Sequence, residues 1–163
     1  MEIRIKVEEY VKQRIQALRQ QNPSQYENIS VLRTNAMKFL PNFFKKGQLS
    51  KMFFLFPDPH FKRKKHKARI INDCLLAEYA FVLREEGMLY VATDVLELYE
   101  WMTNCLNAHP LFKRIDNTEL ENDPVIECIT NSTEEGKKVA RNNGDKYWAV
   151  YRRIRFIPRG NVE

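Results

Sequence analysis

Apolar residues along the chain recur with a helical spacing in three segments. From Ile5 to Arg19 the apolar positions follow a roughly helical spacing, with Lys, Arg and Gln between them, which predicts an amphipathic helix. A second helix is predicted from Ala68 to Arg84, and Gly87 is expected to end it. A third is predicted to run towards His109-Pro110, with Asp94 as its cap.

Shorter apolar runs between these helices predict strands. Asn28 to Arg33 is the first, and Lys51 to Phe56 is a compact run that stops at Pro-Asp-Pro, as expected of a strand buried on both faces. Met88 to Thr93 is the third run. The chain then changes character, because residues 111–115 and 147–156 form strand patterns separated by a polar segment and a short helix that starts near Ser132.

The order of these elements indicates the fold class. Strands that alternate with helices form a parallel sheet covered on both faces, and ligands bind at the carboxyl ends of its strands. Neither a repeat nor a linker rich in Pro, Gly or Ser divides residues 1–163, so we expect a single α/β domain. Asp58 and Asp94 each follow a predicted strand, and their carboxylates are expected to lie close together at that edge.

Composition narrows the class of protein. The chain is 44% hydrophobic and 12% aromatic, which is typical of a globular domain, and its net charge of +6 favours a polyanionic partner such as nucleic acid or an anionic membrane surface. Three widely spaced cysteines without a CxxC pair indicate neither a disulfide framework nor a zinc site, so no metal is expected. Because no apolar segment resembles a signal sequence or a membrane span, we expect a cytosolic or nuclear protein.

The segment from Asp58 to Arg69 is the most informative, because a rigid corner precedes a run of basic residues. Pro57 and Pro59 restrict the backbone of Asp58 and could aim its carboxylate at a substrate. The Lys and Arg side chains would bind phosphates, and His60 or Phe61 could stack on an exposed base. A solvated loop or a nuclear-localisation patch is the alternative interpretation.

Residues 53–63, Phe-Phe-Leu-Phe-Pro-Asp-Pro-His-Phe-Lys-Arg, together with His66-Lys67, closely resemble the signature of the tRNA guanine-N(7) methyltransferases. The eukaryotic branch of that family is the nearest match. Asn35-Ala36, Thr93-Asp94 and residues 132–137, Ser-Thr-Glu-Glu-Gly-Lys, look like further motifs of the family in the same order. The resemblance extends from Met1 to about Ile154.

The resemblance implies a class I, Rossmann-like, S-adenosylmethionine-dependent methyltransferase that modifies one guanine in the variable loop of tRNA. Asp58 matches the active-site carboxylate. The residues that match cofactor contacts are Glu2, Ile3, Arg4, Asn35, Ala36, Leu55, Thr133, Glu134 and Glu135. The candidate tRNA-binding residues are Lys62, Arg63, His66, Lys67 and Asp94.

Several of these matches also have a purely structural interpretation. Asn35 could cap a helix, Leu55 could be a core residue, and Thr133 with the two following glutamates could simply begin a helix. Their joint order within the chain favours the functional interpretation.

The sequence also departs from the pattern of the family it resembles. The chain starts where the second strand of such a domain would end, and none of its five glycines lies in a GxG cluster. We therefore expect an N-terminally truncated domain without its first strand and helix. Three hypotheses remain: the family enzyme, an inactive isoform or fragment that retains tRNA or partner binding, and a basic scaffold without an RNA role. The resemblance further implies a WD-repeat non-catalytic subunit as partner and a nuclear location, with the cytoplasm as the alternative.

Overall fold

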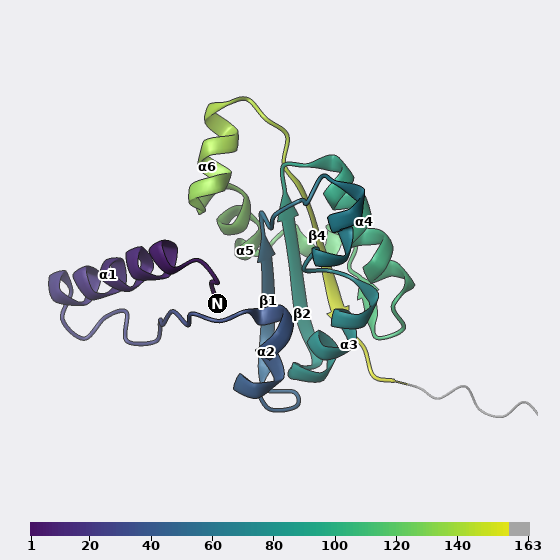
Figure 1. Ribbon diagram of the computed structural model, residues 1–163, viewed down its shortest axis with the longest axis horizontal. Helices are drawn as coiled ribbons and strands as arrows, with labels where there is room; N and C mark the ends of the chain where they lie inside the picture. Colours follow the sequence, from purple (N-terminus) through teal and green to yellow (C-terminus); the bar gives the residue numbers. More distant parts are fainter. Residues whose placement is uncertain (157–163) are drawn as a thin grey trace, which may run out of the picture. The chain divides into compact units, whose positions relative to one another are not determined.

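The computed structural model describes residues 1–156, which divide into two compact units. The first unit, Met1–Phe43, contains α1 (Ile5–Gln21) and α2 (Ala36–Phe43). The second begins at Phe44 and contains the β-sheet with its covering helices (Figure 1). The expectation of a single domain stays a prediction.

The first unit confirms one predicted helix and corrects one predicted strand. The helical pattern from Ile5 becomes α1, which extends to Gln21. The strand expected at Asn28–Arg33 is wrong, because only an isolated parallel bridge joins Glu2 to Arg33. A run of apolar residues forms a strand only where a neighbouring backbone offers a ladder of hydrogen bonds, and within this unit the pairing of residues 28–33 is limited to the bridge at Glu2. Helix α2 was not anticipated.

The second unit is built on a four-stranded sheet in the order β1-β2-β4-β3. The strands are β1 (Leu49–Leu55), β2 (Leu83–Thr93), β3 (Phe112–Arg114) and β4 (Tyr147–Arg153). Strands β1 and β2 are parallel, as the alternation of elements predicts, whereas β4 is antiparallel to both β2 and β3. The fold is α/β, and the carboxyl ends of β1 and β2 meet at one edge.

Side chains along each strand alternate between the two faces of the sheet, and each face is covered by other parts of the chain. One face packs on α3 (Asp73–Val82) and α4 (Leu96–Ala108) (Figure 1). The ring of Phe54 lies 4.9 Å from that of Tyr79, and the Tyr151 hydroxyl donates to Asn107 at 2.9 Å. On the other face a second buried cluster forms between the sheet and residues 115–129; its members are Tyr90, Ala92, Val150, Ile115, Leu120 and Ile129.

The helix predicted for Ala68–Arg84 is shorter than expected. Residues Arg63–Ala68 form a separate 3₁₀ helix, and α3 ends at Val82 because Leu83 already belongs to β2. Gly87 therefore does not end the helix but lies inside β2. A side chain there would meet Arg84 O at 2.8 Å, so the irregular start of this strand has room only for glycine.

The remaining helices lie near the predicted positions. Asp94 is not the cap of α4: the N-cap is Val95, whose N–H donates to Oγ1 of Thr93 at 3.2 Å. The helix expected near Ser132 is confirmed as α6 (Glu134–Arg141), with Thr133 as its N-cap. Between β3 and α6 lie the 3₁₀ helix Asn117–Leu120, α5 (Pro124–Glu127) and a π-helical turn, Cys128–Ser132. Along residues 1–156, no helix combines the length and apolar character that crossing a membrane requires.

Candidate functional site: a strained corner at the carboxyl edge of the sheet

The chain leaves β1 through a corner with unusual backbone angles. Phe56 has φ 50° and His60 has φ 46°, both in the left-handed region that side chains with a Cβ rarely adopt. The N–H of Phe56 donates to Ala92 O at 2.7 Å and so holds the start of the corner against β2. Each such residue costs about 1–3 kcal/mol, and strain of this kind clusters at functional sites. The corner is therefore a candidate site on geometric grounds.

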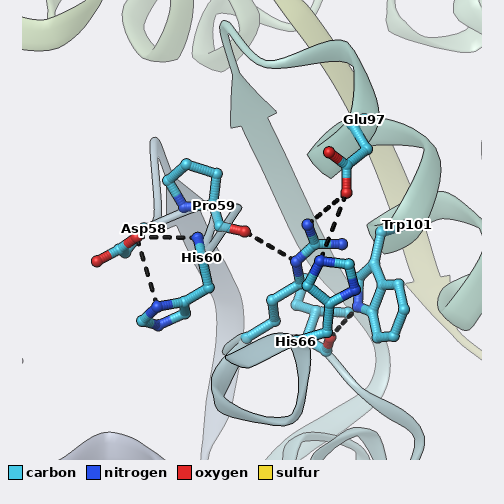
Figure 2. Close-up of polar contacts among 8 residues, drawn as sticks. Asp58, Pro59, His60, His66, Glu97 and Trp101 are labelled. Atoms are coloured by element: carbon cyan, nitrogen blue, oxygen red, sulfur yellow. Dashed lines mark hydrogen bonds and ion pairs between the residues drawn. The ribbon is translucent and has the colours of Figure 1, made fainter. Parts of the chain in front are cut away.

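Asp58 lies in the middle of this corner with its carboxylate directed outward. Its side chain is 73% exposed. One oxygen, Oδ1, accepts the main-chain N–H of His60 at 2.9 Å and lies 3.6 Å from Nδ1 of the same residue (Figure 2). The other oxygen, Oδ2, accepts no hydrogen bond from a residue in the described range. The corner thus presents one free carboxylate oxygen at the sheet edge.

Asp94 follows the neighbouring strand. Leu55 at the end of β1 is paired with Ala92, so the backbones that lead to Asp58 and Asp94 leave the sheet side by side. Asp94 is exposed. The expectation that the two carboxylates lie close together stays a prediction.

The basic run after the corner forms an exposed 3₁₀ turn. None of its five exposed cations forms an ion pair with a residue in the range 1–156; they are Lys62, Arg63, Lys64, Lys65 and Lys67. Their charges are available to phosphates. His66 is different, since it is half-buried, packs edge-on against Trp101 at 5.4 Å and lies 3.7 Å from the Glu97 carboxylate. It faces the interior of the turn.

Arg69 ends the basic run and is buried, with 1% of its surface exposed. Its Nε donates to Pro59 O at 2.9 Å and its Nη2 to Glu97 Oε1 at 2.7 Å, while its guanidinium lies 4.8 Å from the centre of the Trp101 indole ring (Figure 2). The hydrogen bond from Arg69 holds the pKa of the Glu97 carboxyl below its ordinary value. Sequence analysis missed this cluster, because Arg69 cannot be told apart from the exposed cations before it.

Glu2, the first of the predicted cofactor residues, lies in the first unit and is bridged to Arg33, two residues before Asn35. The N–H of Glu2 donates to Leu32 O and the N–H of Thr34 donates to Glu2 O, both at 3.0 Å, so the segment after Glu2 runs parallel to the segment that reaches Asn35. Hydrogen bonds from the Arg4 side chain, together with main-chain N–H donors, lower the pKa of Glu2. An ionised carboxylate at this position can accept hydrogen bonds from the hydroxyls of a ribose.

Asn35 directly precedes α2 and caps its start, as the alternative interpretation of the sequence allowed. Its Oδ1 accepts the N–H of Met37 at 3.0 Å, which leaves the amide nitrogen as a donor without a partner among the described residues. Ala36, the first residue of α2, is half-buried. The cap and a contact to a base are therefore compatible roles for the same side chain.

The other predicted cofactor residues belong to the second unit. Leu55 is half-buried and packs against the cluster around Tyr90 and Ala92. Thr133 caps α6 by accepting the N–H of Gly136 at 3.0 Å. The glutamates that follow are exposed and pair with lysines one turn later, Glu134 with Lys137 at 3.8 Å and Glu135 with Lys138 at 3.2 Å. The helix-start interpretation is thus confirmed for Thr133, and the cofactor roles stay predictions.

Metal ligation has no candidate in the described part of the chain. Among residues 1–156, no three His, Cys, Asp or Glu side chains are grouped so that they could hold an ion. The groups that the structure presents at the sheet edge are carboxylates, cations and aromatic rings, which suit binding and orientation of an organic substrate.

The fold and this edge define the class of protein as an α/β methyltransferase domain, and comparison with known families agrees. Residues 1–149 match the family described as "Putative methyltransferase", whose members have the class I S-adenosylmethionine-dependent fold, and the chain belongs to this family.

Curated relatives of the chain carry the name tRNA (guanine-N(7)-)-methyltransferase. The chain is 63% identical to the Bombyx mori protein over 153 residues, which cover 94% of this chain and 65% of the relative. It is 60% identical to the Arabidopsis thaliana protein over 158 residues, which cover 96% of this chain and 63% of the relative. For the Caenorhabditis briggsae protein the identity is 59% over 156 residues, with 94% and 61% covered. The chain thus spans somewhat less than two thirds of the length of these relatives.

Proposed function

We propose that this protein transfers a methyl group from S-adenosylmethionine to ring nitrogen 7 of a guanine in the variable loop of tRNA. The observation that carries the proposal is the strained corner at the carboxyl edge of β1 and β2, which presents the free oxygen of Asp58 and continues directly into five exposed cations. The name of the relatives, at about 60% identity, supports the same reaction.

The chemistry requires orientation more than acid–base assistance. Nitrogen 7 of guanine already carries a lone pair, and S-adenosylmethionine supplies an activated methyl on its sulfonium. The free Oδ2 of Asp58 would accept the N–H groups on the Watson–Crick edge of the guanine, with Asp94 as a second acceptor. Holding that edge turns nitrogen 7 in a fixed direction, and such orientation can provide a large part of a rate enhancement.

Residues of the first unit would contact the nucleoside part of the cofactor. The ionised Glu2 would accept hydrogen bonds from the ribose hydroxyls, and the side-chain amide of Asn35, which is unpaired within residues 1–156, would donate a hydrogen bond to the adenine. Ala36 would pack on the adenine ring. Ile3 and Arg4 follow Glu2 directly, and both main-chain N–H groups donate to its carboxylate, which keeps Glu2 oriented.

The second unit carries four further candidate cofactor residues. Leu55 would line an apolar wall, because it is half-buried at the end of β1. Thr133, Glu134 and Glu135 would contribute polar contacts from the first turn of α6.

The tRNA would be held mainly through its phosphates. Lys62, Arg63 and Lys67 are exposed and unpaired within the described residues, so each can neutralise one phosphate. His66, packed against Trp101, would contribute by shaping the turn as well as by contact with RNA. We further propose that the protein works with a WD-repeat non-catalytic subunit in the nucleus.

A second candidate is binding of tRNA or of a partner without methyl transfer. It is favoured by one observation: the five exposed cations after the corner form no ion pair within residues 1–156, and phosphate binding by such cations requires no methyl donor. The basic turn would function equally well in such a protein. The two candidates differ in cofactor binding and in methyl transfer.

The experiment that tests the proposal uses the purified 163-residue chain, after a thermal melt has shown that it is folded. Calorimetric titration measures S-adenosylmethionine binding, and radiolabelled cofactor measures methyl incorporation into tRNA. We expect micromolar binding, and incorporation that disappears when the variable-loop guanine is replaced by 7-deazaguanine, which lacks the accepting nitrogen. RNA binding without cofactor binding by the folded chain would instead establish the second candidate.

A further inference from the structure

Arg69 is a buried charge that stability alone does not explain. Burying an ionised group is costly unless it is paired, and an apolar side chain of similar volume often stabilises such a position at least as well. Here the guanidinium is 1% exposed, although its carboxylate partner Glu97 is 56% exposed. A charge kept in this setting points to a requirement for directed hydrogen bonds.

The bonds of Arg69 connect the two loops at the carboxyl edge of the sheet. Nε donates to Pro59 O, the carbonyl of the residue directly after Asp58. Nη2 donates to Glu97, which lies in the first turn of α4, three residues after Asp94. The donors of a guanidinium are fixed in one plane, so the two bonds set a relative direction as well as a distance.

The region between α3 and α4 also has hydrogen bonds that do not involve the guanidinium. The indole N–H of Trp101 donates to Ile71 O at 2.8 Å and so ties α4 to the residues before α3. Asn72 caps α3 by accepting the N–H of Leu75 at 3.0 Å. What Arg69 adds to this frame is the link to the corner (Figure 2).

We propose that Arg69 is a positioning residue that fixes the corner carrying Asp58 against the first turn of α4, with Glu97 and Trp101 orienting its guanidinium. The proposal rests on the proposed function for its catalytic meaning, since the corner is where the guanine would be held. Its structural content can be measured without any methyl transfer.

The first test is backbone hydrogen exchange in the folded chain with Arg69→Met. The main-chain N–H of His60 donates to Asp58 Oδ1 and therefore reports the closed corner. We expect exchange at His60 to accelerate at least tenfold while the amides of β2 keep their protection. Methionine removes the buried charge itself, and the exposed Glu97 remains solvated, so the variant is expected to fold.

Arg153→Met provides a matched control. Arg153 is 12% exposed, its Nε donates to Ala80 O at 3.3 Å, and its Nη1 pairs with Glu85 at 3.3 Å, so it also joins a main-chain carbonyl to an exposed carboxylate. The Arg153→Met variant should leave hydrogen exchange at His60 unchanged. Unchanged exchange at His60 in Arg69→Met, or equal acceleration by both variants, would overturn the proposal. If Arg69→Met also loosens β2, Glu97→Gln tests the same link from its exposed end.

The second test separates positioning from general loss of structure. In a chain that transfers methyl groups, Arg69→Met should lower kcat at least tenfold with KM for tRNA changed less than threefold, and Arg69→Lys should restore little, because an ammonium cannot reproduce both bonds. Added methylguanidinium should recover part of kcat in Arg69→Ala. A fall in tRNA affinity with kcat intact would refute the assignment. If the unaltered chain transfers no methyl group, the proposed function fails, while hydrogen exchange still decides the role of Arg69.

Discussion

The main-chain N–H of His60 donates to Oδ1 of Asp58 at 2.9 Å, within a corner where His60 itself has a left-handed backbone. This bond turns the carboxylate back along its own loop and occupies one of its two oxygens. The other oxygen is presented outward, at the end of a strand whose neighbour delivers Asp94. The chain has therefore oriented the group before any substrate arrives, and preorganisation of this kind reduces the cost of binding in a productive geometry.

Asp58→Asn is expected to lower methyl transfer at least 100-fold with little change in tRNA affinity. Asparagine keeps an acceptor for the His60 N–H, but it presents an uncharged amide to the N–H groups of the base, which weakens the charge-assisted bond. Because the Asp58 side chain is 73% exposed, the melting temperature should change little. Single-turnover rates and a binding assay separate the two effects. Asp116→Asn, at another exposed aspartate, serves as control, and unaltered turnover in Asp58→Asn would exclude the orientation role.

Lys62→Ala with Arg63→Ala is expected to weaken tRNA binding and to flatten its dependence on salt. Each lost phosphate contact reduces the slope of log K against log salt concentration by about 0.7–0.9. The slope is obtained from filter binding between 50 and 200 mM salt. Lys45→Ala with Lys46→Ala removes the same charge before β1, at the other end of that strand from the corner. Equal effects of the two double variants would show that only net charge matters.

Gly87→Ala is expected to lower the free energy of unfolding by about 1–3 kcal/mol, the usual cost of forcing a side chain into filled space. The added carbon would lie 2.8 Å from Arg84 O and 2.9 Å from the side chain of Leu83, both of which are fixed at the start of β2. Chemical denaturation measures the loss. Stability equal to that of the unaltered chain would mean that this part of β2 rearranges freely.

Stability is expected to fall as the pH drops below about 6.5, in part because of His109. Burial lowers the pKa of His109 from its ordinary value of 6.5, and its Nδ1 accepts the N–H of Leu111 at 3.3 Å, a bond that protonation breaks. A depressed pKa in the folded state means that the contribution to stability is full above 6.5 and is lost as the pH falls through the lower folded value. His109→Asn keeps an acceptor without titrating, so its melting temperature should change less between pH 7.5 and 5.5. The same change in both proteins would rule out this contribution.

Local patterns made much of the fold predictable from the sequence. The period of apolar residues identified α1 and α4, and the run that ends at Pro57 identified β1, because in each case the buried side chains repeat within a few residues. The boundaries of α3 and β2 were missed, since the helix passes into the strand without a polar break between Val82 and Leu83. Only tertiary packing decides where the helix ends and the strand begins.

The candidate site was predictable in part. Asp58 and the exposed cations follow from a motif that is continuous in the chain. The contact of Arg69 with Glu97 joins residues 28 positions apart, and the hydrogen bond from Tyr90 to Asp123 at 2.8 Å joins residues 33 positions apart. Such partners have no local signature, because their proximity is created by the sheet and by the helices that cross it.

Two anchors constrain the length of the segment from Phe56 to Arg69. Phe56 is held at one end by its bond to Ala92, and Arg69 is held at the other between Pro59 and Glu97. Surface loops usually accept insertions and deletions. Here one residue more or fewer between the two anchors would move Asp58 out of register with the guanidinium that holds its neighbour. Between these anchors the number of residues is therefore part of the site, in addition to the charges that the basic turn carries.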